Sequence, residues 1–319
     1  MPFLPSLLLN LGHALDHLFL LIFATAVSAI AQDFGVAGWE DMMPYTVGAF
    51  MMFGFASIPA GRMGDLWGRR QMMLVFFFGI GLSAIAVSLT QTPLQMGIAL
   101  TVLGVFSAIY HPVGIPMLVQ KAVRPGFTIG INGLAGNLGI ALAALSTGFL
   151  VAWQGWRMAF IVPGLVSIAC GFVFAWSAPQ EGSAPAKKKS NSVQLPKNVA
   201  WRTFAVMVAT ATTTSVLFNI TTNGNAQLLA ERLDCLVNDP ARLGMLLAAI
   251  YAVASLAQLV VGRLLDWFPV KPLFFCVLVL QIVAFGVASQ TSGWLWYVAA
   301  IGYMVMVFGA IPFSDTMVV

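Results

Sequence analysis

Runs of about twenty apolar residues recur along almost the whole chain, separated by short polar intervals. A helix of that length crosses the hydrocarbon core of a bilayer, where every backbone polar group must be hydrogen-bonded internally. We therefore expect an all-α, polytopic bundle of transmembrane helices. Cutting the chain at its charged, proline-rich or glycine-rich intervals predicts ten spans, at residues 6–31, 42–60, 71–90, 93–119, 127–152, 157–177, 201–229, 242–262, 272–289 and 294–319.

The composition excludes an ordinary soluble domain. Hydrophobic residues make up 60% of the chain and charged residues only 8%, so polar groups cannot cover the surface and the solvent must be lipid. The formal net charge of +4 does not indicate a nucleic acid partner, because the basic residues lie in short connections and form no continuous basic face.

The positions of the basic residues predict the orientation. Cytoplasmic connections of membrane proteins are enriched in Lys and Arg, so we expect a cytoplasmic N-terminus in a cell (inner) membrane. With that orientation the inside connections contain twelve of the fifteen basic residues: Arg62, Arg69, Arg70, Lys121, Arg124, Lys187, Lys188, Lys189, Lys197, Arg202, Arg263 and Lys271.

The longest polar interval runs from Ala178 to Ala200, and its Pro, Ser and Lys residues are typical of a flexible linker. It divides the chain into two parts. We predict an N-terminal six-helix bundle at 1–177, a cytoplasmic linker at 178–200 and a partial, four-helix C-terminal bundle at 201–319.

A short charged motif occurs once in each part. GRMGDLWGRR at 61–70 has a counterpart in GRLLDWFPVKPL at 262–273. Both copies follow the second span of their part, and they share Gly61 with Gly262, Arg62 with Arg263, and Asp65 with Asp266. We expect the first copy to form a tight cytoplasmic turn. Internal repeats of this kind are typical of secondary transporters.

The pattern GxxxDxxGRR resembles the signature loop between the second and third helices of the major facilitator superfamily. The matching residues are Gly61, Gly64, Asp65, Gly68, Arg69 and Arg70, and GWRMAF at 155–160 is similar to the turn into the sixth helix of that family. The resemblance implies two six-helix halves, with helices one, four, seven and ten around a central cavity. It also implies that the second half is incomplete here, as in a product truncated after the tenth helix.

The resemblance gives the two charged motifs a role in conformational gating, at Gly61, Arg62, Gly64, Asp65, Gly68, Arg69, Arg70, Gly262, Arg263 and Asp266. Asp65 can accept hydrogen bonds from an arginine or a helix N-terminus, and we expect that breaking and remaking those contacts biases an inward-closed against an inward-open state. The simpler alternative is that the arginines only fix the topology.

The first span contains ionisable side chains in the sequence NLGHALDHLF. His13 and His17 share one helical face with Asn10, and Asp16 lies beside them. A charge at bilayer depth costs roughly 2.5 to 3.5 kcal/mol on insertion scales, so such residues usually face a cavity and have a function. We expect Asp16 to couple transport to protons, with His13 and His17 tuning its protonation. The alternative is a structural Asp–His pair between helices.

Two further spans contribute candidate cavity residues. In AIYHPVGIP, Pro112 and Pro116 remove backbone donors, and the resulting kink makes Tyr110 and His111 candidate substrate contacts. A packing kink with a satisfied histidine is an equal alternative. In the seventh span Asn219 and Asn223 are weaker candidates, since polar side chains there can also hold helices together.

The function predicted from these residues and the resemblance is secondary active transport of a small solute by alternating access, coupled to protons, in a monomer without cofactor or resident metal. Two alternatives remain open. One is a sensor-like or inactive truncated transporter. The other, remote, is an intramembrane metalloenzyme with zinc on His13, Asp16, His17 and His111, whose residue types alone are weak support. The first reading predicts that the chain is not an enzyme.

Overall fold

The computed structural model describes residues 2–120, 122–123, 125–180, 196–234, 236–237 and 239–313. In these ranges every regular element is a helix, and nine of the helices are long and apolar enough to cross a membrane. The predicted all-α, polytopic class is thereby confirmed. The chain forms two compact units, one with residues 1–184 and 237–249, the other with residues 185–236 and 250–319.

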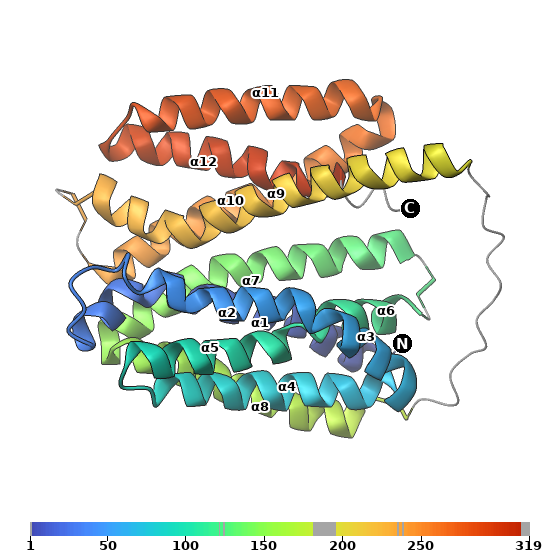
Figure 1. The fold of residues 1–319 in the computed structure, drawn as a ribbon, viewed down its shortest axis with the longest axis horizontal. Coiled ribbons are helices and arrows are strands. Elements are labelled where there is room, and N and C mark those ends of the chain that lie inside the picture. Colours follow the sequence, from blue (N-terminus) through green and yellow to red (C-terminus); the bar gives the residue numbers. More distant parts are fainter. Residues whose placement is uncertain are drawn as a thin grey trace. The chain divides into compact units, whose positions relative to one another are not determined.

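The first unit is built from pairs of long helices. α1 (Phe3–Asp33) lies along α7 (Pro125–Gln154), α4 (Arg69–Ser88) lies along α8 (Trp156–Ser177), and α2 lies beside α5 (Figure 1). The remaining elements are the 3₁₀ helix η1 (Met43–Thr46), α2 (Val47–Phe55), α3 (Ser57–Trp67), α5 (Pro93–Ser107), the π-helix η2 (Tyr110–Gly114) and α6 (Ile115–Val119).

Small residues allow two of these helix pairs to pack closely. A Cβ atom on Gly139 of α7 would lie 2.1 Å from the backbone oxygen of Ala14 in α1, and one on Gly104 of α5 would lie 2.2 Å from that of Ala49 in α2. No side chain fits at either position. Close backbone approach of this kind is how helices gain packing contacts in a bilayer, where the hydrophobic effect does not drive them together.

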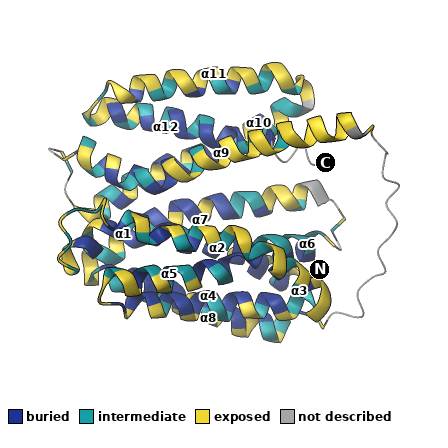
Figure 2. Cartoon of the chain, viewed as in Figure 1, coloured by how far each residue is buried: buried dark blue, intermediate teal, exposed yellow. Residues whose placement is uncertain are grey.

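Apolar side chains lie on both the inside and the outside of the bundle. Phe76, Phe77 and Tyr110 are fully buried, whereas Leu82, Ile98 and Phe172 are among many large apolar side chains that are exposed (Figure 2). A soluble protein of this size would not expose so many. The outer faces therefore suit contact with lipid.

The structure corrects the prediction for the charged motif. A span at 42–60 followed by a tight turn was expected, but α2 ends at Phe55 and, after Ala56 alone, α3 continues to Trp67. Gly61, Arg62, Gly64 and Asp65 are thus helical, and Arg69 and Arg70 begin α4. The motif does contain a tight turn, but the turn is confined to Gly68, whose φ of 102° is a backbone conformation that glycine adopts without strain. One residue therefore suffices to reverse the chain.

The second unit contains α9 (Lys197–Arg232), α11 (Val270–Ser289) and α12 (Gly293–Gly309), and α10 (Pro240–Trp267) has residues in both units. α12 lies against α11 and also contacts α9. Gly262 and Arg263 are within α10, so the second charged motif also begins in a helix. The side chain of Asp266, residues 181–195 of the predicted linker and residues 314–319 of the last predicted span lie outside the described part of the chain.

Candidate transport site

α1 presents three ionisable side chains to the interior of the first unit. His13, Asp16 and His17 follow one another at helical spacing, so one short stretch of α1 holds them all. His13 is 5% exposed and Asp16 is fully buried, and His17 is half-buried. This confined polar group inside an apolar bundle is the candidate site.

Asn132 of α7 fixes the ring of His13. The backbone oxygen of Asn132 lies 2.7 Å from His13 Nδ1, and because a carbonyl only accepts, Nδ1 is the protonated nitrogen. The other ring nitrogen, Nε2, lies 3.1 Å from Nε2 of His17. His13 therefore accepts there and His17 donates. The ring also stacks on Tyr110 at 4.8 Å between centroids.

The π-helix η2 brings His111 to the same place. Pro112 and Pro116 supply no backbone N–H, so the regular α-helical ladder is interrupted at Tyr110–Gly114. His111 Nε2 lies 3.5 Å from Oδ2 of Asp16. Its ring is also edge-on to the rings of His13 and His17, at 5.0 and 5.6 Å. Two distant segments of sequence thus meet around Asp16.

Asp16 has few polar partners for a buried carboxyl group. Neither of its oxygens makes a hydrogen bond by geometric criteria, and the nearby buried hydroxyl of Ser107 is also unpaired. His111 is the one ion-pair partner found for it among the described residues. A buried polar group without hydrogen bonds is costly and calls for an explanation, which makes Asp16 the most unusual residue of the unit.

A second network, which the sequence did not reveal, supports the site. Asn132 Nδ2 donates to the Tyr110 hydroxyl at 2.7 Å and to Asn10 Oδ1 at 3.0 Å. The Tyr110 hydroxyl donates in turn to the backbone oxygen of Leu9 at 2.7 Å. Tyr110 is fully buried, so its hydroxyl holds α1, η2 and α7 together. Asn132 was missed because it lies in a glycine-rich helix where the small residues suggested only close helix packing.

The two asparagines predicted from the seventh span belong to the other unit, on α9. Asn219 is exposed and donates to Ser215 O within its own helix, and Asn223 is largely buried and donates to Asn219 O. The contacts that join helices in this unit use different residues: the Tyr251 hydroxyl donates to Thr222 O, and the Tyr303 hydroxyl donates to Asn225 Oδ1.

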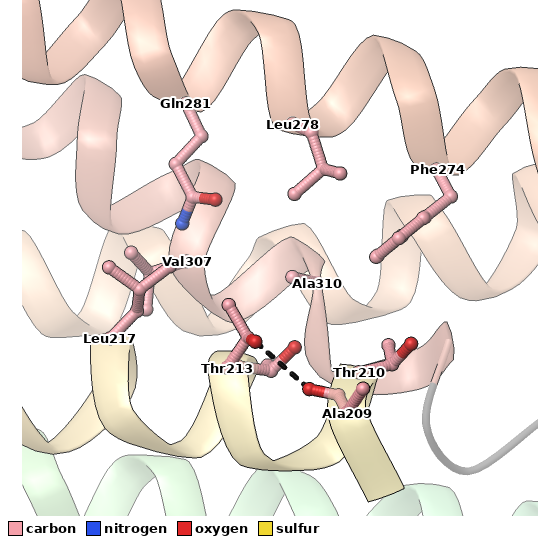
Figure 3. Close-up of a pocket in the computed structure, with 10 residues that line it drawn as sticks. Ala209, Thr210, Thr213, Leu217, Phe274, Leu278, Gln281, Val307 and Ala310 are labelled. Atoms are coloured by element: carbon pink, nitrogen blue, oxygen red, sulfur yellow. Dashed lines mark hydrogen bonds between the residues drawn. The ribbon is translucent and has the colours of Figure 1, made fainter. Parts of the chain in front are cut away.

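A cavity of about 230 Å³ lies among α9, α11 and α12 (Figure 3). Its lining is mainly apolar, with threonines such as Thr213, whose hydroxyl donates to Ala209 O of the same helix. None of the residues that line it is charged, and none is a predicted site residue. We therefore do not assign the cavity as the transport site.

Arg70 binds the end of α8. Its Nε donates to Ala178 O at 2.9 Å and its Nη2 to Ala175 O at 2.5 Å. A cation at a helix C-terminus satisfies unpaired carbonyls and the negative end of the helix dipole. Asp65, in contrast, is 57% exposed and lies 3.9 Å from Arg69. The structure thus joins Arg70 to α8 and pairs Asp65 only loosely with Arg69.

The start of α8 is fastened as well. Arg157 forms an ion pair with Asp33 at the end of α1, at 2.7 Å, and donates to Thr90 O just beyond α4 at 3.3 Å. Trp156 Nε1 donates to the same Asp33 oxygen at 3.2 Å. The predicted motif at 155–160 therefore ties α1, the end of α4 and α8 together.

A comparison with models of protein families identifies the family of this chain. The model of the major facilitator superfamily matches residues 9–318. The chain belongs to the major facilitator superfamily. It is therefore a multi-pass membrane protein of a transporter family, as the resemblance implied, and not an enzyme. The metalloenzyme alternative is thereby excluded.

Of two curated relatives, one is named as a transporter and the other as a resistance protein. The chain is 29% identical over 176 residues to the probable actinorhodin transporter of Streptomyces coelicolor, covering 53% of this chain and 30% of the relative. It is 24% identical over 270 residues to the multidrug resistance protein MdtG of Yersinia enterocolitica, covering 79% and 63%. The match to the first relative thus spans less than a third of that protein's length.

Solved structures share the fold at low identity. A bacterial homologue of the human lysosomal transporter Spinster, in an inward-facing conformation, aligns with a TM-score of 0.75 and 14% identity over 98% of this chain and 78% of that one. The nucleoside transporter NupG aligns with a TM-score of 0.74 and 13% identity, covering 99% and 82%. These likenesses support the fold alone.

Proposed function

We propose that this protein is a proton-coupled secondary transporter that moves a small solute by alternating access. Membership of the superfamily supports transport, and the relatives include a protein named as a probable actinorhodin transporter. A D-xylose–proton symporter is among its structural neighbours, with a TM-score of 0.66 over 96% of this chain. The proposal adds the coupling residue, Asp16, and the residues around it.

The burial of Asp16 is the observation that supports proton coupling most. A carboxylate at bilayer depth without hydrogen bonds is unfavourable, and a proton removes its charge. Alternating access could expose Asp16 to each side in turn, so that it gains a proton on one side and releases it on the other. A potential of 100 mV offers about 2.3 kcal/mol per charge moved, enough to drive accumulation of a solute.

His111 is the direct proton partner in this proposal. Its Nε2 lies 3.5 Å from Asp16, and its side chain is 39% exposed, so it connects the buried carboxyl group with the outside of the unit. His13 and His17 lie against it and complete a chain of exchangeable nitrogens. Asn219 and Asn223 of the second unit remain weaker candidates for solute binding.

The test is a flux measurement on the complete gene product in proteoliposomes, with a solute first identified by ligand-induced thermal stabilisation. Asp16→Asn should remove solute-driven proton movement, read from an internal pH dye, because an amide cannot carry the proton. Glu40→Gln, which changes an exposed carboxyl group of the same unit, should leave the flux unchanged. Undiminished proton-linked flux in Asp16→Asn would contradict the proposal.

Three related features stay proposals. We place the N-terminus and both charged motifs on the cytoplasmic side of a cell membrane, because that orientation puts most basic residues inside. We keep the division into bundles at 1–177 and 201–319, with a linker between them, and a monomeric state. We assign gating to the charged motifs, with release of Arg70 from the end of α8 as the step that loosens the closed state.

A further inference from the structure

The whole chain contains three histidines, and all three meet at one place. Each of His13, His17 and His111 offers a ligand atom, and these atoms all lie within 4.8 Å of one another. They come from two segments of sequence that the fold brings together. We propose that these histidines bind a divalent transition-metal ion of the zinc, nickel or cobalt class and that, given the proposed transport function, this ion is the solute.

The distances suit one ion with small adjustments. Two imidazole nitrogens bound to a tetrahedral ion at 2.0–2.1 Å are about 3.3 Å apart. His13 Nε2 and His17 Nε2 are 3.1 Å apart, and the largest separation in the cluster is 4.8 Å. Side-chain rotations that move the ring nitrogens by about an ångström would therefore bring all three nitrogens to one ion.

The ring of His13 has the hydrogen bond that usually orients a metal-binding histidine. Ligating histidines usually donate their second ring N–H to a backbone carbonyl or a carboxylate, which fixes the tautomer and aims the free lone pair at the ion. His13 Nδ1 donates to Asn132 O at 2.7 Å, which leaves Nε2 unprotonated, with its lone pair directed at His17. Gly136 leaves room for this ring, since a Cβ there would lie 2.7 Å from His13 Nε2.

Asp16 supplies the charge that such a site needs. Its two oxygens are buried and make no hydrogen bond, and Oδ2 lies 3.5 Å from His111 Nε2. A cation bound to the three neutral rings would offset this isolated carboxylate, and Asp16 would act as the outer partner of His111. The presence of an ion thus gives a physical reason for a buried acid whose charge has only the distant contact with His111 to offset it.

The donor set also indicates which ions would be selected. Imidazole nitrogens favour zinc, nickel, cobalt and copper, whereas calcium and magnesium require several oxygen ligands. Three protein ligands leave the fourth position for water, as in sites that exchange ligands. The half-exposed side chain of His111 gives the ion a way in and out, which a cargo site needs and a closed structural site does not.

The first test measures binding to the purified full-length protein carrying a histidine-free tag. Cobalt(II) should give the intense visible absorption of a tetrahedral complex, and equilibrium dialysis with zinc should give one ion per chain. His17→Gln and His111→Gln should each weaken binding at least about tenfold. Thr25→Val, which changes a polar residue of α1 outside the cluster, should bind as the unchanged protein does.

A second measurement needs no substitution, so a variant that fails to fold cannot obscure the answer. Zinc should protect the histidines from acylation by diethyl pyrocarbonate, and because the chain has only three, peptide mass spectrometry can follow each one. Absence of stoichiometric binding, binding that survives both histidine substitutions, or no protection by zinc would overturn the inference.

Flux measurements separate this inference from the proposed function. Zinc binding without zinc flux in proteoliposomes of the complete gene product would keep the site and overturn its role as a cargo site. Proton-linked flux of another solute, in a protein that binds no zinc, would overturn the metal site and leave the proposed function standing.

Discussion

Tyr110 connects three segments through one hydroxyl group. It donates to Leu9 O and accepts from Asn132 Nδ2, both at 2.7 Å. Tyr110→Phe removes both hydrogen bonds and leaves the buried amide of Asn132 with one partner fewer. We expect a loss of about 1–3 kcal/mol in stability, from the broken bonds and the unpaired polar groups.

Thermal unfolding in detergent measures this loss. The matched control is Tyr45→Phe, a half-buried tyrosine of the same unit that does not belong to this network and should change the midpoint much less. Equal midpoints for the two variants would show that the Tyr110 hydroxyl does not hold the site together.

Residue patterns predicted only part of the candidate site. The spacing of His13, Asp16 and His17 gave their common position on one helix, because helical periodicity is local. His111 was grouped with them only through the resemblance and the zinc alternative, because its approach depends on a π-turn and on how η2 packs against α1. Asn132 could not be predicted, because its backbone oxygen, which any residue has, makes the contact with His13.

At the scale of elements, α1 and α7 approach each other closely at Gly139. Gly139→Ala should push them apart, because the new Cβ would lie 2.1 Å from Ala14 O, a backbone atom that cannot rotate away. We expect a loss of about 1–3 kcal/mol, as for other overpacked sites. Because His13 and Asp16 are on α1, metal or solute binding should weaken as well.

Gly130→Ala on the same helix is the control for that substitution. Nothing lies within 4 Å of a Cβ at position 130, so the variant should keep its thermal midpoint. Similar destabilisation by both variants would mean that the α1–α7 approach is not what makes Gly139 necessary, because alanine favours a helix more than glycine does.

Helix boundaries were predicted well where proline or a change of polarity marks them. α5 begins at Pro93 as expected, and α8 at Trp156 begins one residue before the predicted start. The second span failed because its glycines and charges were interpreted as a turn, whereas α3 accommodates Gly61 and Gly64 within a helix. The sequence could not distinguish a helical glycine from a turn glycine, since that depends on neighbours such as Val113, against which Gly64 packs.

At the scale of the whole molecule, the orientation of the two charged motifs can be tested directly. In a cysteine-free version of the complete protein, Arg62→Cys and Arg263→Cys should both react with membrane-impermeant reagents only from the cytoplasmic side. Glu40→Cys, on an exposed outer connection in the proposed topology, should react only from outside. Labelling of positions 62 and 263 from opposite sides would contradict both the topology and the proposed repeat.

The fastening of α8 at both ends limits how the first unit can deform. At its start, Arg157 joins it to Asp33 of α1 and to the end of α4, and at its finish Arg70 of α4 holds its last carbonyls. Movement of α8 relative to α1 and α4 would therefore break contacts at one or both of its ends, and the three helices move together as long as Arg70 and Arg157 keep these contacts. The π-turn of η2, at Tyr110–Gly114, lies outside these three helices, and its interrupted hydrogen-bond ladder is a place where the unit can bend without breaking those contacts.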